Sequence, residues 1–157
     1  MGVQFECELT EGGALLTSDE RFKKARADNA AEAAADYVEL IQDLIDEFGE
    51  ARATDLATHM GVSHVTVSKG LQRLVKNGLV TYRPYRSIFL TEKGRDLARD
   101  ARERHVVVLQ FLLALGVPNL VAEQDAEGME HHLSPETMAA FSKYLESARA
   151  ASDVPKN

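Results

Sequence analysis

Residues 54–90 read TDLATHMGVSHVTVSKGLQRLVKNGLVTYRPYRSIFL, and this stretch decides the fold. A short helix is predicted over about 54–60, followed by a turn that contains Gly61. Ser63 can cap a second helix, because its hydroxyl can accept a hydrogen bond from an unpaired backbone N–H of the first turn. That second helix has an apolar face and is expected to end at 77–78, where Asn-Gly is a typical helix end.

Two short strands are predicted after these helices, over 79–83 and 88–90. Helix, turn, helix and two-stranded ribbon is the order of a winged helix-turn-helix, although a helix pair alone is too common to indicate DNA binding. The charge distribution supports DNA binding, since residues 51–104 hold 11 Lys and Arg against 5 Asp and Glu. The whole chain has a net charge of −7. A local basic patch matters more for contact with a polyanion than the net charge does.

The predicted DNA contacts fall into two groups. The N-terminal part of the second helix of such a unit enters the major groove. We therefore expect base edges to be contacted by Ser63, His64, Thr66 and Lys69. We expect phosphates, which add affinity without carrying sequence information, to be contacted by Arg73, Lys76, Arg83 and Arg86. The alternative for Lys69, Arg73 and Lys76 is that they only solvate an exposed helix face.

The rest of the chain is predicted to be mainly helical. Apolar periodicity and capping residues indicate helices over about 30–48 and 91–115, and two more that open near Pro118 and Pro135. The sequence therefore predicts a mainly α protein with an N-terminal winged helix-turn-helix domain and a C-terminal helical dimerisation domain. The expected divisions are a mobile arm over 1–29 that can hold a short helix after Ser18, a DNA-binding domain over 30–98, and a dimerisation and metal-binding domain over 99–157.

Composition excludes several other classes of protein. Cys7 is the only cysteine, which leaves no disulfide framework and no cysteine-rich metal site. No apolar run reaches the roughly 18–20 residues that span a membrane, and the N-terminus lacks the pattern of a secretory signal. We expect a cytoplasmic protein without a membrane partner. The clustered leucines of the C-terminal helices, together with the advantage of reading two half-sites, predict a homodimer.

Acidic residues and histidines form a second constellation. Asp36 and Glu39 could belong to the solvated face of the first helix, and His105 could be a core histidine. Glu127, Glu130 and His131 are more specific, because spacings of three and four place them on one helical face, where carboxylates repel one another unless a cation is present. A site rich in carboxylate, with two imidazoles and no thiolate, suits an octahedral divalent ion such as Mn²⁺ better than tetrahedral zinc.

With these residues in view, the chain resembles the diphtheria-toxin-repressor-like family of iron- and manganese-dependent transcription regulators, in its manganese transport regulator branch. The resemblance covers about 36–144 and includes the helix-turn-helix, Arg104-His105 and 125–134. It implies two Mn²⁺ ions per subunit, held by Asp36, Glu39, His105, Glu127, Glu130 and His131. Iron-responsive relatives carry Met at the position of Asp36 and Cys at that of Glu127, so the oxygen ligands here imply manganese.

The resemblance also implies a function. We expect a Mn²⁺-dependent regulator that chiefly represses manganese uptake genes by binding a palindromic operator as a homodimer, without catalysis and without an organic small-molecule substrate. Two rival functions remain. A di-metal carboxylate enzyme would show metal-dependent turnover without DNA binding. A metal-independent winged-helix module would bind DNA in the presence of a chelator.

Overall fold

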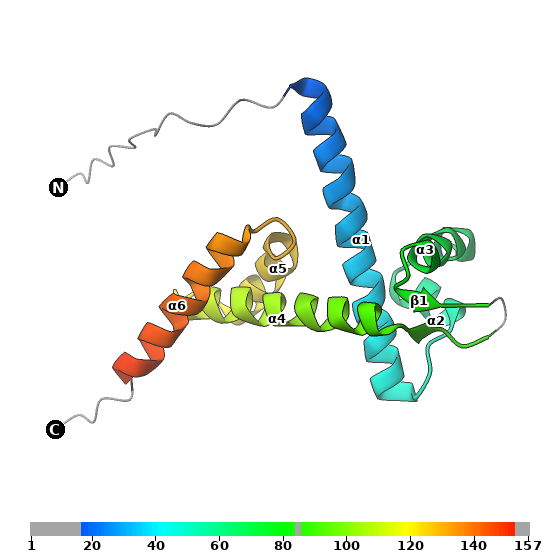
Figure 1. Cartoon of the computed structure of the whole chain (residues 1–157). Helices are drawn as coiled ribbons and strands as arrows, with labels where there is room; N and C mark the ends of the chain where they lie inside the picture. Colours follow the sequence, from blue (N-terminus) through cyan, green and yellow to red (C-terminus); the bar gives the residue numbers. More distant parts are fainter. Residues whose placement is uncertain (1–16, 84–85, 153–157) are drawn as a thin grey trace.

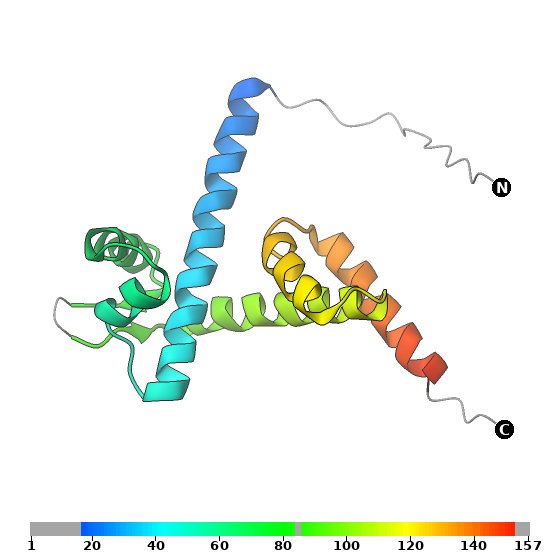
Figure 2. The ribbon, with the colours of Figure 1, turned by 180° about the vertical axis from the view of Figure 1, so that it is seen from behind.

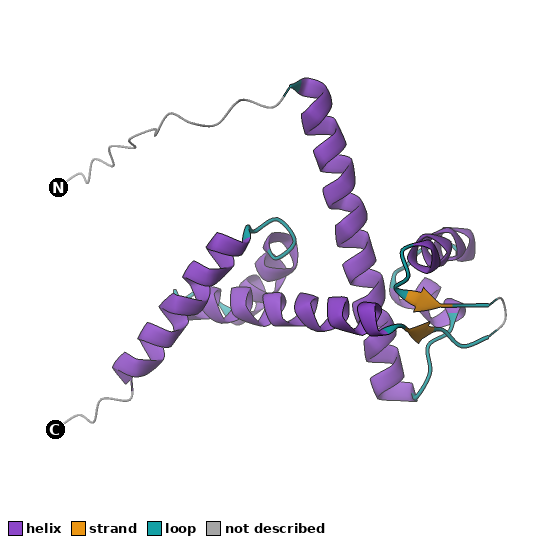
Figure 3. Cartoon of the chain, viewed as in Figure 1, coloured by secondary structure: helices purple, strands orange, loops and turns teal. Residues whose placement is uncertain are grey.

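The computed structural model describes residues 17–83 and 86–152, and this part of the chain is mainly helical (Figures 1 and 3). The elements in chain order are α1 (Ser18–Phe48), α2 (Ala53–His59), α3 (His64–Lys76), β1 (Val80–Thr81), β2 (Phe89–Leu90), α4 (Glu92–Ala114), α5 (Asn119–Met129) and α6 (Pro135–Ser152). The two long helices α1 and α4 pack against each other. Figures 1 and 2 show α2, α3 and the hairpin at one end of α4, and α5 and α6 at its other end. The predicted fold class is confirmed.

Helix α1 begins at Ser18, where the sequence analysis allowed a short helix, and continues without a break into the helix predicted over about 30–48. Thr17 and Glu20 form a reciprocal capping box, in which the backbone N–H of Thr17 donates to the Glu20 carboxylate at 2.8 Å and the N–H of Glu20 donates to the Thr17 hydroxyl at 3.3 Å. The following segment is rich in alanine, the residue that favours helix most strongly. Residues 18–29 are therefore helical and continuous with α1, whereas residues 1–16 of the predicted arm lie outside the described residues. The helix ends as predicted, at Gly49 with φ of 79°.

The helix-turn-helix forms as predicted. The Ser63 hydroxyl accepts from the N–H of Thr66 at 3.2 Å and so caps α3. The apolar face of α3 is buried against α1 and α2 in a core that includes Ile41, Leu56 and Leu71. The α3–α1 contact is close, because a Cβ added at Gly70 would lie 2.7 Å from Cζ of Tyr37.

The wing is a two-stranded antiparallel sheet with Val80 opposite Leu90. Its strands are shorter than the predicted 79–83 and 88–90, and Ile88 instead forms an isolated bridge with Ala51. The wing also meets the start of α4 closely. A Cβ at Gly94 would lie 2.0 Å from the carbonyl oxygen of Leu79, so glycine is required there for α4 to reach the hairpin.

Helix α4 joins two hydrophobic cores. Its first half contributes Ala98 to the core of the winged-helix part. Its second half contributes Val108 and Leu112 to a smaller core with α5 and α6. In that region the rings of Phe111 and Phe141 are stacked with centroids 3.8 Å apart. Groups on the middle of α4 therefore lie where the two packed units meet.

Candidate metal centre

The six predicted metal ligands come from three places in the fold. Asp36 and Glu39 lie on α1, and His105 lies in the middle of α4. The other three lie at the end of α5, but not all on its helical face as the sequence analysis predicted. Helix α5 ends at Met129, so Glu127 is helical, Glu130 is the C-terminal cap residue and His131 lies in the following turn.

Glu130 is at the centre of this cluster. It is the buried charged residue of the described chain, with a relative exposure of 2%. One carboxylate oxygen lies 2.7 Å from Nδ1 of His105, and the other lies 3.4 Å from Nε2 of His131. A buried carboxylate is costly unless it is paired. The two imidazoles therefore account for its placement between α4 and the turn after α5.

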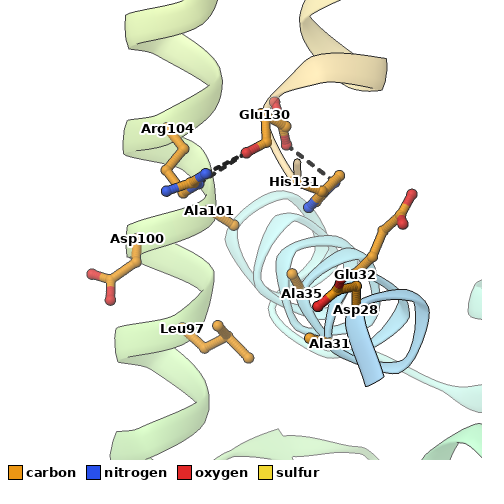
Figure 4. Close-up of a pocket in the computed structure, with 10 residues that line it drawn as sticks. All are labelled: Asp28, Ala31, Glu32, Ala35, Leu97, Asp100, Ala101, Arg104, Glu130 and His131. Carbon is orange, nitrogen blue, oxygen red and sulfur yellow. Dashed lines mark hydrogen bonds and ion pairs between the residues drawn. The ribbon is translucent and has the colours of Figure 1, made fainter. Parts of the chain in front are cut away.

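His131 reaches across to α1. Its Nε2 also lies 3.3 Å from a carboxylate oxygen of Asp36. The chain of contacts from His105 through Glu130 and His131 to Asp36 thus connects α4, the end of α5 and α1. Figure 4 shows Glu130 and His131 beside α1, at a cavity of about 210 Å³ between α1 and α4.

The other two carboxylates are nearby but less firmly held. Glu127 lies 3.6 Å from Nδ1 of His105, and its side chain is largely exposed. Glu39 is partly buried and forms no hydrogen bond or ion pair among the described residues. It is close enough to Glu130 and Glu127 for their charges to act on it. All six predicted residues therefore belong to one neighbourhood.

The electrostatics of the cluster favour protons or a cation. Burial raises the pKa of Asp36, and it also raises the pKa of Glu39, with repulsion from Glu130 adding to the latter. Burial likewise raises the pKa of Glu130, although its hydrogen bond to His105 opposes the shift. Burial acts against protonation of His105, but the carboxylates of Glu130 and Glu127 outweigh it and raise the pKa of the imidazole. Each carboxylate would therefore be stabilised by added positive charge.

The geometry stops short of a formed coordination shell. Within residues 17–83 and 86–152, no three histidine, cysteine, aspartate or glutamate side chains converge on one point that could hold an ion. The contacts that hold the cluster are histidine–carboxylate pairs. The donor set nevertheless fits a hard or borderline divalent cation, because it consists of carboxylate oxygens and imidazole nitrogens. The helices place all six residues in one region.

Sequence reasoning missed Glu123. Its carboxylate lies 3.4 Å from Nε2 of His105, on the opposite side of the ring from Glu130. A carboxylate at one ring nitrogen fixes the tautomer and orientation of a histidine that uses its other nitrogen as a ligand. Glu123 stands one helical turn before Glu127 on α5, so the four-residue spacing was the signal that could have found it.

The predicted DNA-contacting residues lie together on the winged-helix end of the molecule. All eight are exposed: Ser63, His64, Thr66, Lys69, Arg73, Lys76, Arg83 and Arg86. The hydroxyls of Ser63 and Thr66 lie 3.0 Å apart, so these two are partly engaged with each other. Arg83 and Arg86 flank the tip of the wing and contribute to its surface hollow. Nothing in the structure tests whether any of them contacts DNA.

Two family models cover most of the chain. Residues 30–88 match the iron-dependent repressor N-terminal DNA-binding domain, and residues 91–153 match the iron-dependent repressor metal-binding and dimerisation domain. The chain is 52% identical over 122 residues to the transcriptional regulator MntR of Escherichia coli O6:H1. The aligned region covers 78% of this chain and 79% of that protein. The chain belongs to the iron-dependent repressor family. It resembles the manganese-regulator members of this family, as the sequence analysis predicted.

A second relative named as a regulator and a solved structure named as a manganese-dependent repressor also match the chain. The regulator is 41% identical over 99 residues to an MntR of Geobacillus kaustophilus, and the aligned region covers 63% of this chain and 70% of that protein. Its structure is similar to a manganese-dependent transcriptional repressor in complex with manganese, with a TM-score of 0.63 and 30% identity. The match covers 72% of this chain and 52% of that one, so the regulator spans about half the length of that solved chain. These relatives are named as regulators or repressors, not as enzymes.

The matches also set the organisation of the regulator. It combines a DNA-binding domain with a metal-binding and dimerisation domain, and is a metal-dependent transcription regulator. The cluster of carboxylates and histidines lies between residues matched by the first model and residues matched by the second. No helix within the described residues is long and apolar enough to cross a membrane.

Proposed function

We propose that this regulator is a Mn²⁺-responsive repressor, chiefly of manganese uptake genes. The observation that carries the proposal is the contact of His131 with both Asp36 and Glu130, at 3.3 Å and 3.4 Å, because it joins a residue of the DNA-binding half to residues of the C-terminal half. We place the boundary between the halves at 98/99, within α4. The ligands we assign are Asp36, Glu39, His105, Glu127, Glu130 and His131.

The proposed ion is Mn²⁺, with two ions per subunit. Carboxylate oxygens in the majority, two imidazoles and no thiolate suit manganese rather than softer metals. A bound divalent cation would supply positive charge to carboxylates that now repel one another. Six donors with several carboxylates able to bridge are enough for two ions that share ligands.

The ligands divide between the halves in a way that couples metal to DNA. Asp36 and Glu39 move with α1, and α1 packs directly on α3, the predicted recognition helix. His105, Glu127 and Glu130 move with the C-terminal helices. When both sets bind the same ions, the orientation of α3 relative to the C-terminal half is restricted. Fewer orientations are then sampled, and those that fit DNA are favoured.

We propose a homodimer bound to a palindromic DNA operator. The C-terminal half, which matches a dimerisation domain, exposes large apolar side chains at Leu115, Leu120 and Val121. Two recognition helices related by a twofold axis can read two half-sites one helical turn or a multiple of it apart. We further propose that the regulator acts in the cytoplasm, has no catalytic activity and takes no organic substrate.

The test is a thermodynamic cycle on the full-length protein. Mn²⁺ affinity is measured with and without saturating operator DNA, and operator affinity is measured with Mn²⁺ and with a chelator. Linkage requires the two ratios to be equal, and coupling of about 1–3 kcal/mol is typical. Glu130→Gln, which keeps the volume of the buried side chain, should lose the metal response. Equal Mn²⁺ affinities with and without operator would contradict the proposal.

A matched control is available on the same helix. Asp46 lies on α1 and is exposed; it accepts a hydrogen bond from Gln42 and lies 4.0 Å from Arg102 of α4, and it does not contact the cluster. Asp46→Asn removes one carboxylate from α1 and should leave both Mn²⁺ affinity and coupling unchanged. Metal-dependent turnover of a substrate without DNA binding would favour a di-metal enzyme instead.

A further inference from the structure

One arginine holds the backbone of the turn that carries Glu130 and His131. Arg104 lies on α4 next to His105. Its Nε and Nη2 both donate to the carbonyl oxygen of Glu130, at 3.0 Å and 2.5 Å, and its Nη2 also donates to the carbonyl oxygen of Leu133 at 2.7 Å. Figure 4 shows the side chain extending from α4 to Glu130.

The carbonyl of Glu130 is at the place where α5 loses its own hydrogen bonds, and that of Leu133 lies in the connection to α6. The last carbonyls of a helix have no partner within the helix and need donors from elsewhere. Helix α5 ends at Met129, and the backbone then turns with the N–H of His132 donating to the carbonyl of Met129 at 3.0 Å. Arg104 supplies donors on either side of His132. The turn is therefore fastened to α4 and not only to its own helix.

Arg104 and His105 both bind Glu130, one through its backbone and the other through its side chain. Arg104 binds the backbone carbonyl of Glu130, and His105 contacts its carboxylate at 2.7 Å. Two adjacent positions of one rigid helix thus fix both the position and the direction of the Glu130 side chain. His131 follows directly in the chain, so its position is restricted as well.

The guanidinium of Arg104 forms its hydrogen bonds without pairing with a carboxylate. Acidic residues line the same cavity, namely Asp28, Glu32, Asp100 and Glu130. Among the described residues, however, Arg104 donates only to carbonyl oxygens and forms no ion pair. The carboxylates that would bind an ion stay free, while the backbone beneath them is held. A planar guanidinium can donate to two carbonyls in this way, whereas the ammonium of lysine lacks the fixed fork.

We infer that Arg104 is a positioning residue for the metal centre: it presets the 130–133 turn so that Glu130 and His131 face a cation. This inference rests on the proposed metal site. Arg104→Lys keeps the charge and most of the side chain but loses the fork, and Arg104→Gln loses both. Both variants should bind Mn²⁺ about 10–100-fold more weakly than the wild type, the loss that is usual for residues that orient metal ligands.

The experiment uses the full-length protein, and Mn²⁺ affinity is measured at 25 °C by competition with a fluorescent chelator. The matched control is Arg99→Gln, since Arg99 is also on α4 but pairs only with acidic residues of its own helix. It should stay within about twofold of wild type. The reference variant is His131→Ala. If His131→Ala binds Mn²⁺ like the wild type, the proposed site itself is wrong. If His131→Ala loses affinity and Arg104→Lys does not, only the role of Arg104 is wrong.

A second readout needs no metal, and its main measurement uses the wild type. In the chelator-treated wild type, the Nε–H of Arg104 should exchange with solvent more slowly than the Nε–H of Arg99, because it is bonded to a carbonyl. In Arg104→Lys, the backbone amide of His132 should exchange faster than in the wild type. A merely structural role would lower the unfolding midpoint and leave the affinity of the folded protein unchanged. Rapid exchange of the Arg104 Nε–H in the wild type would overturn the inference.

Discussion

The Nε2 atom of His131 lies 3.3 Å from a carboxylate oxygen of Asp36, so a residue of the turn after α5 contacts a residue of α1. Asp36 is therefore the proposed ligand of the DNA-binding half that directly contacts the C-terminal half. We predict that Asp36→Met weakens activation by Mn²⁺ and improves the relative response to Fe²⁺ or Co²⁺, because a thioether is a softer ligand than a carboxylate. The measurement is a DNA-shift titration with each metal. An unchanged Mn²⁺ response would remove Asp36 from the ligand set.

The raised pKa of Glu39 predicts how stability depends on pH in the presence of a chelator. The usual value for this group is 4.5, and burial together with Glu130 and Asp43 raises the pKa in the folded state. The folded protein therefore holds this proton more tightly than the unfolded chain. The stabilisation is fully present below about pH 4.5 and is lost as the pH rises through the folded-state pKa.

It follows that Glu39→Gln should raise the free energy of unfolding at pH 7 and leave it almost unchanged at pH 4. The gain should be at most about 1 kcal/mol, because solvent screens the partly exposed side chain. Urea unfolding from pH 4 to pH 8 with a chelator measures it. Glu47→Gln, an exposed change on the same helix, is the control. A gain that is equal at pH 4 and pH 7 would contradict the electrostatic explanation.

The contact between Gly70 and Tyr37 predicts a stability and binding defect. A Cβ at position 70 would stand 2.7 Å from both Cζ and Oη of the Tyr37 side chain, so Gly70→Ala must displace the buried Tyr37 ring or push α3 away from α1. We expect a loss of about 1–3 kcal/mol in the free energy of unfolding, together with weaker operator binding. Gly128→Ala is the matched control.

Gly128 lies within α5, and a Cβ there would meet nothing within 4 Å. Alanine in that helical position should stabilise the protein by about 0.5–1 kcal/mol. Thermal unfolding of Gly70→Ala and Gly128→Ala should show a lowered midpoint for the first and a raised midpoint for the second. If Gly70→Ala is also stabilising, α3 can shift without cost and the close contact does not fix its position.

Arg86, beside the tip of the wing, is predicted to contact a phosphate. Each such contact contributes about 0.9 to the slope of log affinity against log salt concentration. Arg86→Ala should therefore flatten the slope by about one unit and weaken binding to all DNA sequences alike. Fluorescence anisotropy with an operator fragment at several salt concentrations measures the slope, and Arg99→Ala on α4 is the control. A mutant slope equal to that of the wild type would place Arg86 away from DNA.

Local signals predicted the helix boundaries well. Ser63 and Gly49 act within one turn of their own position, so their roles at a helix end could be inferred from sequence and are confirmed. A helix after Ser18 was allowed, but its continuity with residues 30–48 was not predicted, because the segment that follows the capping box of Thr17 and Glu20 lacks apolar periodicity. That periodicity reports burial, and residues 18–31 are exposed wherever the structure describes their side chains.

Contacts between distant segments were beyond local reasoning. The Met129 end of α5 was missed because no glycine or proline directly follows Met129 to mark the end of the helix. Arg104 contacts Glu130 and Leu133 from far along the chain, and nothing in its own neighbourhood indicates those partners. The ligand set came from resemblance to the family. The structure places those residues in one region, while their roles as ligands stay a prediction.

The length of helix α4 sets how the wing and the metal centre are oriented relative to each other. Gly94, near its start, lies against the wing, and Arg104 and His105 hold the turn after α5. An α-helix turns by about 100° and rises by about 1.5 Å per residue. One residue inserted between 94 and 104 would therefore rotate Arg104 and His105 by about a quarter of a turn around the helix relative to the wing. Any change in the length of α4 would alter the angle between the wing and the metal centre, so the two ends of the molecule cannot be redesigned independently.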